Sequence, residues 1–308
     1  MYDRIRILDK RNRILWHFLV LTAVYLAIVF ATPADPDLLK KYAISATTVH
    51  FLQAILAIPV VVLLGAAFYG YARLKQYSDM IKKSADGRQI AIMARGLGYI
   101  AYGLVISAII SSILTALKAN NDSLGTVEVI VSNYLGIAYL VVAVTCIGVG
   151  ARGLLGTVKY GLSAKMTYGL ICLSVITSVT YAYFVFKNPD STLRSIYHLP
   201  VWLIITTIVM PYVYMWFVGL LASFQLFVYT RKIHGVIYKK SWRLVSLGLG
   251  AIMLLDITLQ FISALTNGGK NLTLVALFYV LLLLFVLLAA SFLLIANGAR
   301  GLRKIELS

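Results

Sequence analysis

A single acidic residue stands inside a long apolar run of the chain. Asp256 is the only charged residue between Leu244 and Gly269, and it follows Arg243 by 13 residues, about 20 Å along a helix and therefore mid-bilayer. A carboxylate at that depth costs about 3 kcal/mol, so it needs a partner, a proton or water. Gln260 follows one helical turn later on the same face, with Thr258 nearby. These residues predict a proton- or cation-linked intramembrane site.

The alternative is that Asp256 is protonated and joins its helix to a neighbour by a hydrogen bond, as packing glue. Either way its side chain is expected to face the bundle interior, because hydrocarbon offers no hydrogen-bond partner. The candidate partners at similar depth are polar residues of the third and fourth apolar runs: Ser107, Ser111, Asn133, Tyr139 and Thr145.

Two histidines recur at an interval of 148 residues. His50 and His198 both lie at the outer mouth of an apolar run, and one histidine per repeat indicates a heme ligand or a proton relay. The alternative is a pair of imidazoles that face lipid headgroups. No histidine stands on the last apolar run of either half, and no pair has the spacing of a metal site. Heme held by a single histidine is therefore the one cofactor hypothesis, and no metal is predicted.

The same interval relates two five-residue segments with the sequence Gly-Ala-Arg-Gly-Leu, which contain Arg152 and Arg300. An arginine at the cytoplasmic end of a helix complements the helix dipole, and Gly153 or Gly301 could act as the C-cap. The alternative is a symmetric pair of sites for anions or lipid headgroups.

The composition establishes the setting of these residues. Hydrophobic residues make up 61% and charged residues 13% of the 308-residue chain, against about 45–50% and 25% in soluble domains. This excludes a soluble enzyme, a disordered chain and a disulfide scaffold, and indicates an integral, multi-pass membrane protein. Eight apolar runs are long enough to span a bilayer as helices: 14–34, 42–72, 96–117, 129–151, 166–186, 195–230, 244–269 and 271–299.

The basic residues predict the orientation. The N-terminus and every second loop together hold 22 Lys and Arg residues, and the other side holds 6. By the positive-inside rule both termini are cytoplasmic. The net charge of +17 then comes mostly from basic residues that set the orientation of the chain in the membrane, so nucleic acid is not an expected partner. Anionic headgroups on the cytoplasmic side are expected partners, and oligomer or complex partners stay open.

The repeated residues predict a duplicated chain, with a first four-helix repeat over 1–154 and a second over 155–308. Each repeat has an even number of spans, so both enter from the same side and the repeat is parallel. An interval of 148 pairs Asp256 with Ala108. Pro59 and Pro211 pair at 152 instead, and each is expected to kink its helix, because proline removes a backbone hydrogen bond.

The sequence thus predicts an all-α integral membrane protein with eight transmembrane helices in a parallel four-plus-four duplication. A small-molecule or ion transporter is the first interpretation, because of the duplication, the paired prolines and Asp256. A non-catalytic membrane subunit or scaffold of a larger complex is the second, because the loops are minimal. A membrane-embedded enzyme that handles lipid, quinone or heme is the third. The segment 74–92 is either an interfacial helix or an extension of the neighbouring spans.

Overall fold

The computed structural model describes residues 2–31, 45–118, 125–156, 172, 209–265 and 273–307. Seven helices account for nearly all of these residues, and no strand occurs among them. The helices are α1 (Tyr2–Ala31), α3 (Ala46–Met80), α4 (Ala85–Lys118), α5 (Gly125–Leu154), α9 (Met210–Lys232), α10 (Val236–Leu265) and α11 (Leu274–Leu307).

Six of these helices, α1, α3, α4, α9, α10 and α11, contain described segments long and apolar enough to cross a membrane. In α5 the side chains are described only from Ala138 to Leu154, and this part is apolar. The chain is therefore a helical, multi-pass membrane protein. The fifth predicted span, 166–186, lies outside the described residues except for Cys172. The count of eight spans and the side on which the termini lie stay predictions.

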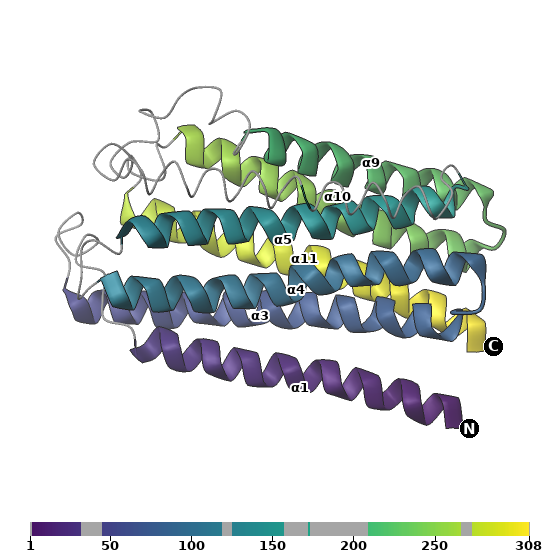
Figure 1. The fold of residues 1–308 in the computed structure, drawn as a ribbon, viewed down its shortest axis with the longest axis horizontal. Coiled ribbons are helices and arrows are strands. Elements are labelled where there is room, and N and C mark those ends of the chain that lie inside the picture. The colour runs from purple at the N-terminus through teal and green to yellow at the C-terminus, as the bar shows by residue number, and fades with distance from the viewer. Residues whose placement is uncertain are drawn as a thin grey trace.

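Six helices form a closed ring of contacts. Along the chain, α3 packs on α4, α4 on α5, α5 on α9, α9 on α10 and α10 on α11, and α11 returns to pack on α3. Helix α1 lies outside the ring against α3 and α4 (Figure 1). Helices α1 and α11 bring the two ends of the chain to the same end of the bundle (Figure 1).

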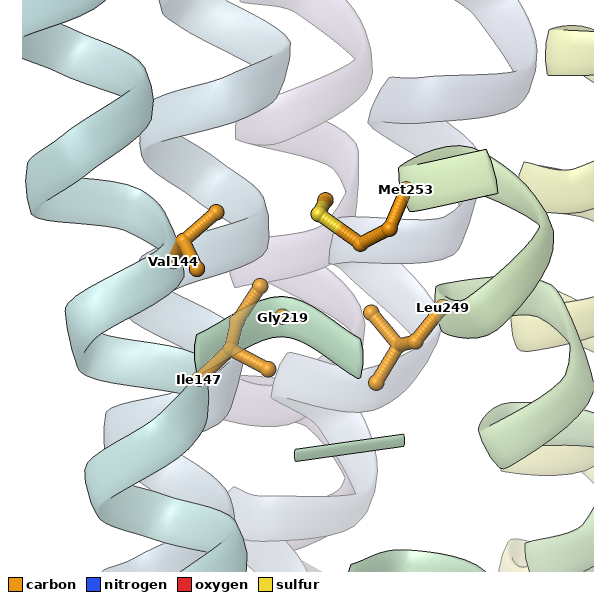
Figure 2. Close-up of a pocket in the computed structure, with 5 residues that line it drawn as sticks. All are labelled: Val144, Ile147, Gly219, Leu249 and Met253. Atoms are coloured by element: carbon orange, nitrogen blue, oxygen red, sulfur yellow. The ribbon is translucent and has the colours of Figure 1, made fainter. Parts of the chain in front are cut away.

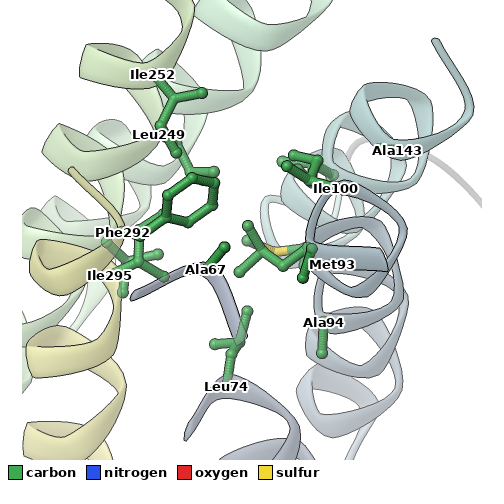
Figure 3. Close-up of a cluster of buried hydrophobic side chains, with 14 of the residues drawn as sticks. Ala67, Leu74, Met93, Ala94, Ile100, Ala143, Leu249, Ile252, Phe292 and Ile295 are labelled. Atoms are coloured by element: carbon green, nitrogen blue, oxygen red, sulfur yellow. The ribbon is translucent and has the colours of Figure 1, made fainter. Parts of the chain in front are cut away.

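The interior of the ring is apolar. Phe292 and Ile295 of α11, Leu249 of α10, Ala67 of α3 and Met93 of α4 are at least 97% buried and point toward a common core (Figure 3). The outside is apolar too. On α10 the exposed Leu247, Leu254 and Phe261 recur every seven residues and make one stripe. A bundle that is apolar on both faces suits lipid rather than water.

Two close helix crossings resemble each other. A Cβ on Gly96 of α4 would lie 2.5 Å from the carbonyl oxygen of Ala143 on α5. A Cβ on Gly248 of α10 would lie 2.6 Å from the carbonyl oxygen of Ser291 on α11. The glycines of the two crossings, on α4 and α10, are 152 residues apart. The residues that they approach, on α5 and α11, are 148 residues apart.

The crossing of α3 with α4 and the crossing of α9 with α10 are also related by an interval of 152 residues. Gly98 approaches Tyr71, and Gly250 approaches Ser223, so both members of the pair differ by 152. The same interval relates Pro59 to Pro211. The equivalence of Asp256 with Ala108 stays a prediction.

The glycines of the repeated Gly-Ala-Arg-Gly-Leu segments lie inside helices, which corrects their expected role as C-caps. Helix α11 continues past Gly301 to Leu307, and the left-handed residue after α5 is Gly156, with φ of 73°. A Cβ on Gly150 would lie 2.7 Å from the backbone oxygen of Gln89 on α4. Gly150 therefore lets the backbones of α4 and α5 approach closely.

The segment 74–92 continues the neighbouring helices and does not form a separate interfacial helix. Helix α3 continues to Met80, four residues follow, and α4 begins at Ala85. Ser84 ends this short connection: its Oγ accepts a hydrogen bond of 2.9 Å from the backbone N–H of Gly87, as an N-cap does.

Candidate functional site

Asp256 faces another helix and has a hydrogen-bond partner there. The indole Nε1–H of Trp216 on α9 donates to Asp256 Oδ2 on α10 over 2.8 Å. Asp256 follows Leu254 of the exposed stripe by two residues, about 200° around the helix, so it points away from that stripe. Asp256 lies six residues before Ile262, the last residue of the apolar segment Val236–Ile262. It is therefore past the middle of the segment, toward the end of the bundle opposite the chain termini (Figure 1).

Further polar groups surround this pair. Tyr212 lies one turn before Trp216 on α9, with its ring centroid 5.9 Å from that of Trp216. The Gln260 side chain on α10 lies near the Tyr212 hydroxyl. Tyr139 of α5 is close enough to Asp256 and Tyr212 to interact with both electrostatically. These five residues, Asp256, Gln260, Tyr212, Trp216 and Tyr139, are called the Asp256 cluster below.

A second polar contact joins α5 to α9. The hydroxyls of Thr145 and Tyr214 lie 3.0 Å apart, and Thr145 also donates to the backbone oxygen of Val141 over 2.7 Å. Thr145, one of the expected partners of Asp256, thus bonds a different residue. The aromatic face of α9 supplies groups for both contacts.

An apolar pocket lies between α5, α9 and α10. Val144 and Ile147 of α5, Gly219 of α9, and Leu249 and Met253 of α10 line it (Figure 2). It has no space for a water molecule. The three helices that carry the Asp256 cluster therefore also meet through closely packed apolar side chains.

Thr258 does not join the cluster. It lies on the exposed stripe of α10, four residues after Leu254, and its hydroxyl donates to the Leu254 backbone oxygen over 2.8 Å. A threonine hydroxyl commonly satisfies itself in this way within a helix. Of the three residues predicted for this site, the structure brings Asp256 and Gln260 together with aromatic partners and leaves Thr258 outside.

The structure describes one of the two predicted heme or relay histidines. His50 is exposed near the start of α3, and its Nδ1 lies 3.2 Å from Gln53 Oε1 one turn later. His198 lies outside the described residues. A third histidine, His17 of α1, has its Nδ1 2.8 Å from the hydroxyl of Tyr102 on α4. In the described part of the chain, no group of three or more His, Cys, Asp and Glu side chains could hold a metal ion.

The paired prolines and arginines occupy unlike positions. Pro59 is buried inside α3, and Pro211 stands in the first described turn of α9, so the residue four positions before Pro211 lies outside the described part of the chain. Arg152 is half-buried in the last turn of α5. Arg300 is exposed and seven residues from the end of α11, so it does not end its helix as predicted.

Trp216 is the site residue that sequence reasoning missed. The candidate partners of Asp256 expected from the sequence lie on the third and fourth apolar runs only. The available signal was the spacing of Tyr212 and Trp216, one turn apart on a single face, with polar atoms at their tips.

Comparisons with family models, with curated proteins and with solved structures found no match to this chain.

Proposed function

We propose that this chain is a small-molecule or ion transporter and that Asp256 is the group that couples transport to a proton or a cation. The observation that carries the proposal is the 2.8 Å hydrogen bond that holds Asp256 toward Trp216 inside the bundle. Acidic residues within membrane spans are costly, and they mark ion pathways and proton relays.

The position of the Asp256 cluster in the ring supports this role. If residues 1–154 and 155–308 are two repeats, the ring is joined between them at two contacts, α5 with α9 and α11 with α3. Asp256 and Trp216 belong to the second repeat, and Tyr139 of the first lies beside them. Transporters with repeats bind their coupling ions near the repeat interface and move one repeat against the other.

The chemistry of the cluster fits a change of charge at Asp256. An ionised Asp256 accepts from the Trp216 N–H, whereas a protonated Asp256 can also donate to an oxygen such as the Tyr139 or Gln260 side-chain oxygen. The two forms therefore favour different contacts between α5, α9 and α10. A proton or cation that binds Asp256 would shift the population of helix arrangements by the difference in these contacts.

The test uses the purified full-length chain in liposomes. Charge movement is recorded under an inward proton or sodium gradient, with mixtures of amino acids, organic acids, organic cations and nucleosides as probes. We expect a current in at least one mixture that Asp256→Asn lowers by roughly tenfold, the effect of losing about 1.4 kcal/mol of coupling. Thr258→Val is the matched control, because Thr258 lies two residues away on the exposed stripe, and it should keep the current.

A wild-type chain that moves no charge above empty liposomes in any mixture would refute the proposal. So would an Asp256→Asn current equal to that of the wild type. A non-catalytic membrane subunit is the second candidate, favoured by the apolar pocket between α5, α9 and α10, which has no space for water. For such a subunit Asp256→Asn would alter the stability or assembly of the protein, and neither the wild type nor the variant would carry a current.

A further inference from the structure

The apolar pocket lies between the Asp256 cluster and the end of the bundle that carries the chain termini. Helix α10 runs away from that end (Figure 1), and on it Leu249 and Met253 of the pocket precede Asp256 by about two turns and one turn. Helices α5 and α9 run toward that end, and on them the pocket residues follow Tyr139 and Trp216. Because the pocket has no space for a water molecule, no water passes through it toward Asp256 in this conformation.

Hydrogen bonds tie α9 to the first proposed repeat at the same end of the bundle. The hydroxyl of Tyr229 on α9 donates to Asp86 Oδ2 at the start of α4 over 2.9 Å. Lys232 Nζ, in the last turn of α9, donates to the backbone oxygen of Leu155 over 3.4 Å, just after the end of α5. Tyr229 follows Gly219 of the pocket by ten residues, about 15 Å along the helix. The pair of Tyr229 and Asp86 is called the Tyr229 latch below, and it lies nearer the chain termini than the pocket does.

Both members of the Tyr229 latch are held in place by their own helices. Asp86 stands in the first turn of α4, where the helix dipole favours a negative charge. The Tyr229 ring meets Trp242 of α10 edge to face, with centroids 5.6 Å apart, and Trp242 is 1% exposed. A hydroxyl that donates to a carboxylate makes a charge-assisted hydrogen bond. The latch therefore ties α4 of the first proposed repeat to α9 and α10 of the second.

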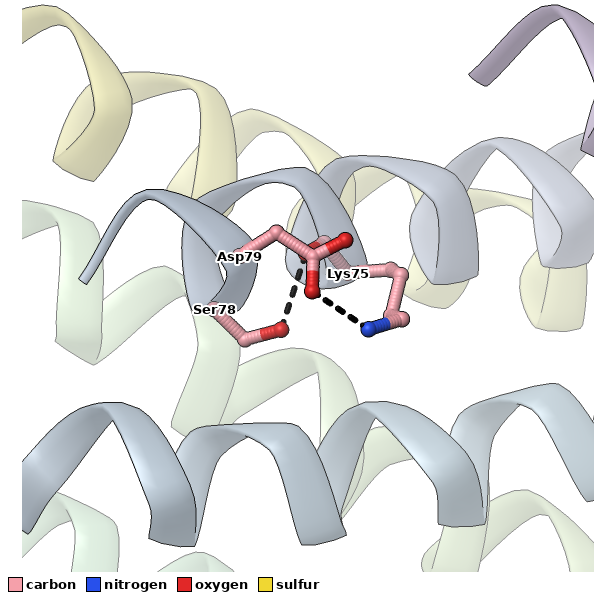
Figure 4. Close-up of polar contacts among 3 residues, drawn as sticks. All are labelled: Lys75, Ser78 and Asp79. Atoms are coloured by element: carbon pink, nitrogen blue, oxygen red, sulfur yellow. Dashed lines mark hydrogen bonds and ion pairs between the residues drawn. The ribbon is translucent and has the colours of Figure 1, made fainter. Parts of the chain in front are cut away.

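The other contact between the proposed repeats, α11 with α3, is also bridged at this end. Arg303 Nη1 on α11 donates to Gln76 Oε1 on α3 over 3.3 Å. One turn along α3, Lys75 and Asp79 form an ion pair of 2.6 Å between successive turns of a single helix (Figure 4). Separating the repeats at this end breaks the contacts made by Tyr229 and Arg303 and leaves the pair of Lys75 and Asp79 intact.

We propose that the Tyr229 latch is a gate on the route to Asp256. While the latch is formed, the apolar pocket stays closed toward the end of the bundle that carries the chain termini. Its release opens the pocket, so that the coupling ion reaches Asp256 from that end. Transporters with repeats open toward one side by moving one repeat against the other. The proposal rests on the proposed function, which supplies the ion that passes, whereas its test records opening and needs no flux.

The test measures how fast a water-soluble thiol reagent reaches the pocket. Val144 of α5 lines the pocket and is fully buried, so Val144→Cys places a thiol there with little change of volume. The full-length chain in detergent micelles carries this substitution, with Cys146→Ala and Cys172→Ser to remove the native thiols. A charged methanethiosulfonate reagent modifies the new thiol only in the open population, so the rate follows that population. We expect Tyr229→Phe to raise the rate by roughly tenfold, as loss of one hydrogen bond to a charged group does.

Matched variants separate release of the latch from a general loosening of the bundle. Tyr279→Phe removes the same hydroxyl from an exposed position near the start of α11, at the opposite end, and should leave the rate unchanged. Lys75→Gln breaks a polar contact at the same end but within one helix, and it should also leave the rate unchanged. Asp86→Ala should raise the rate as Tyr229→Phe does, and it should add nothing when Tyr229→Phe is already present.

Three results would overturn the proposal. The first is a Val144→Cys thiol that, with the latch intact, reacts as fast as a thiol placed by Arg88→Cys at the exposed start of α4. The second is a rate that Tyr229→Phe leaves unchanged, and the third is a control variant that raises the rate as much. A chain with an Asp256-dependent current and a rate insensitive to Tyr229 refutes the latch alone. A chain with no current refutes the proposed function, and the gate then has no ion to admit.

Discussion

Replacing Gly248 by alanine should separate α10 from α11. The new Cβ would lie 2.6 Å from the Ser291 carbonyl oxygen, against 3.4 Å for an ordinary contact, so the helices must move apart by about 0.8 Å. Overpacking of this kind costs about 1–3 kcal/mol. Alanine regains about 1 kcal/mol of helix propensity over glycine. The net expectation is a loss of up to about 2 kcal/mol in the free energy of unfolding.

The matched control is Gly65 of α3. A Cβ there would lie 3.4 Å from the flexible ring of Phe18, which is an ordinary contact. Gly65→Ala should therefore be neutral or stabilise the chain by up to about 1 kcal/mol. The two substitutions add the same methyl group to helical glycines, so they should differ in sign.

The assay is reversible unfolding of the purified chain in mixed micelles, with rising mole fraction of denaturing detergent and circular dichroism as the readout. Gly96→Ala provides an internal repeat of the experiment, because its Cβ would lie 2.5 Å from the Ala143 oxygen at the corresponding crossing. We expect Gly96→Ala and Gly248→Ala to destabilise alike. A Gly248→Ala chain as stable as Gly65→Ala would refute the reasoning from close backbone approach.

Three further outcomes are expected. Trp216→Phe keeps the ring and removes the donor to Asp256, so it should cost about 0.6–1.7 kcal/mol in the same unfolding assay, and nothing further when Asp256→Leu is already present. Gly156→Ala should cost about 1 kcal/mol, because alanine resists the φ of 73° that follows α5; equal stability would contradict this. Tags at Met1 and Ser308 should both be reached only from the cytoplasmic face, and labelling of either from outside would disprove the predicted orientation.

The helices were largely predictable. Seven of the eight apolar runs are helices in the described part of the chain, at about the predicted places. The ends were less predictable: α3 and α4 extend well beyond their apolar runs, and α11 continues past Gly301. Lysine, arginine, glutamate and alanine continue a helix as readily as leucine does once it has begun, so a change of composition marks the membrane boundary rather than the helix end.

The candidate site was predictable only in part. Asp256 stood out because a charge interrupts an apolar run, and Gln260 followed from helical spacing. Thr258 was placed with them by proximity in sequence, but two residues along a helix are about 200° apart, and the structure leaves it on the exposed stripe. The spacing of Tyr212 and Trp216 marked one polar-tipped aromatic face, but it did not show that this face meets Asp256, 40 positions away.

The sequence by itself determined the class of protein, because each span must satisfy its own backbone and cover itself with apolar side chains whatever its neighbours are. The tertiary structure decided which side chains meet. The bond between Trp216 and Asp256 and the close approach of Gly248 to the Ser291 backbone depend on how helices rotate and cross. Small residues set those crossings by letting backbones approach, and this is a property of two helices together rather than of either sequence alone.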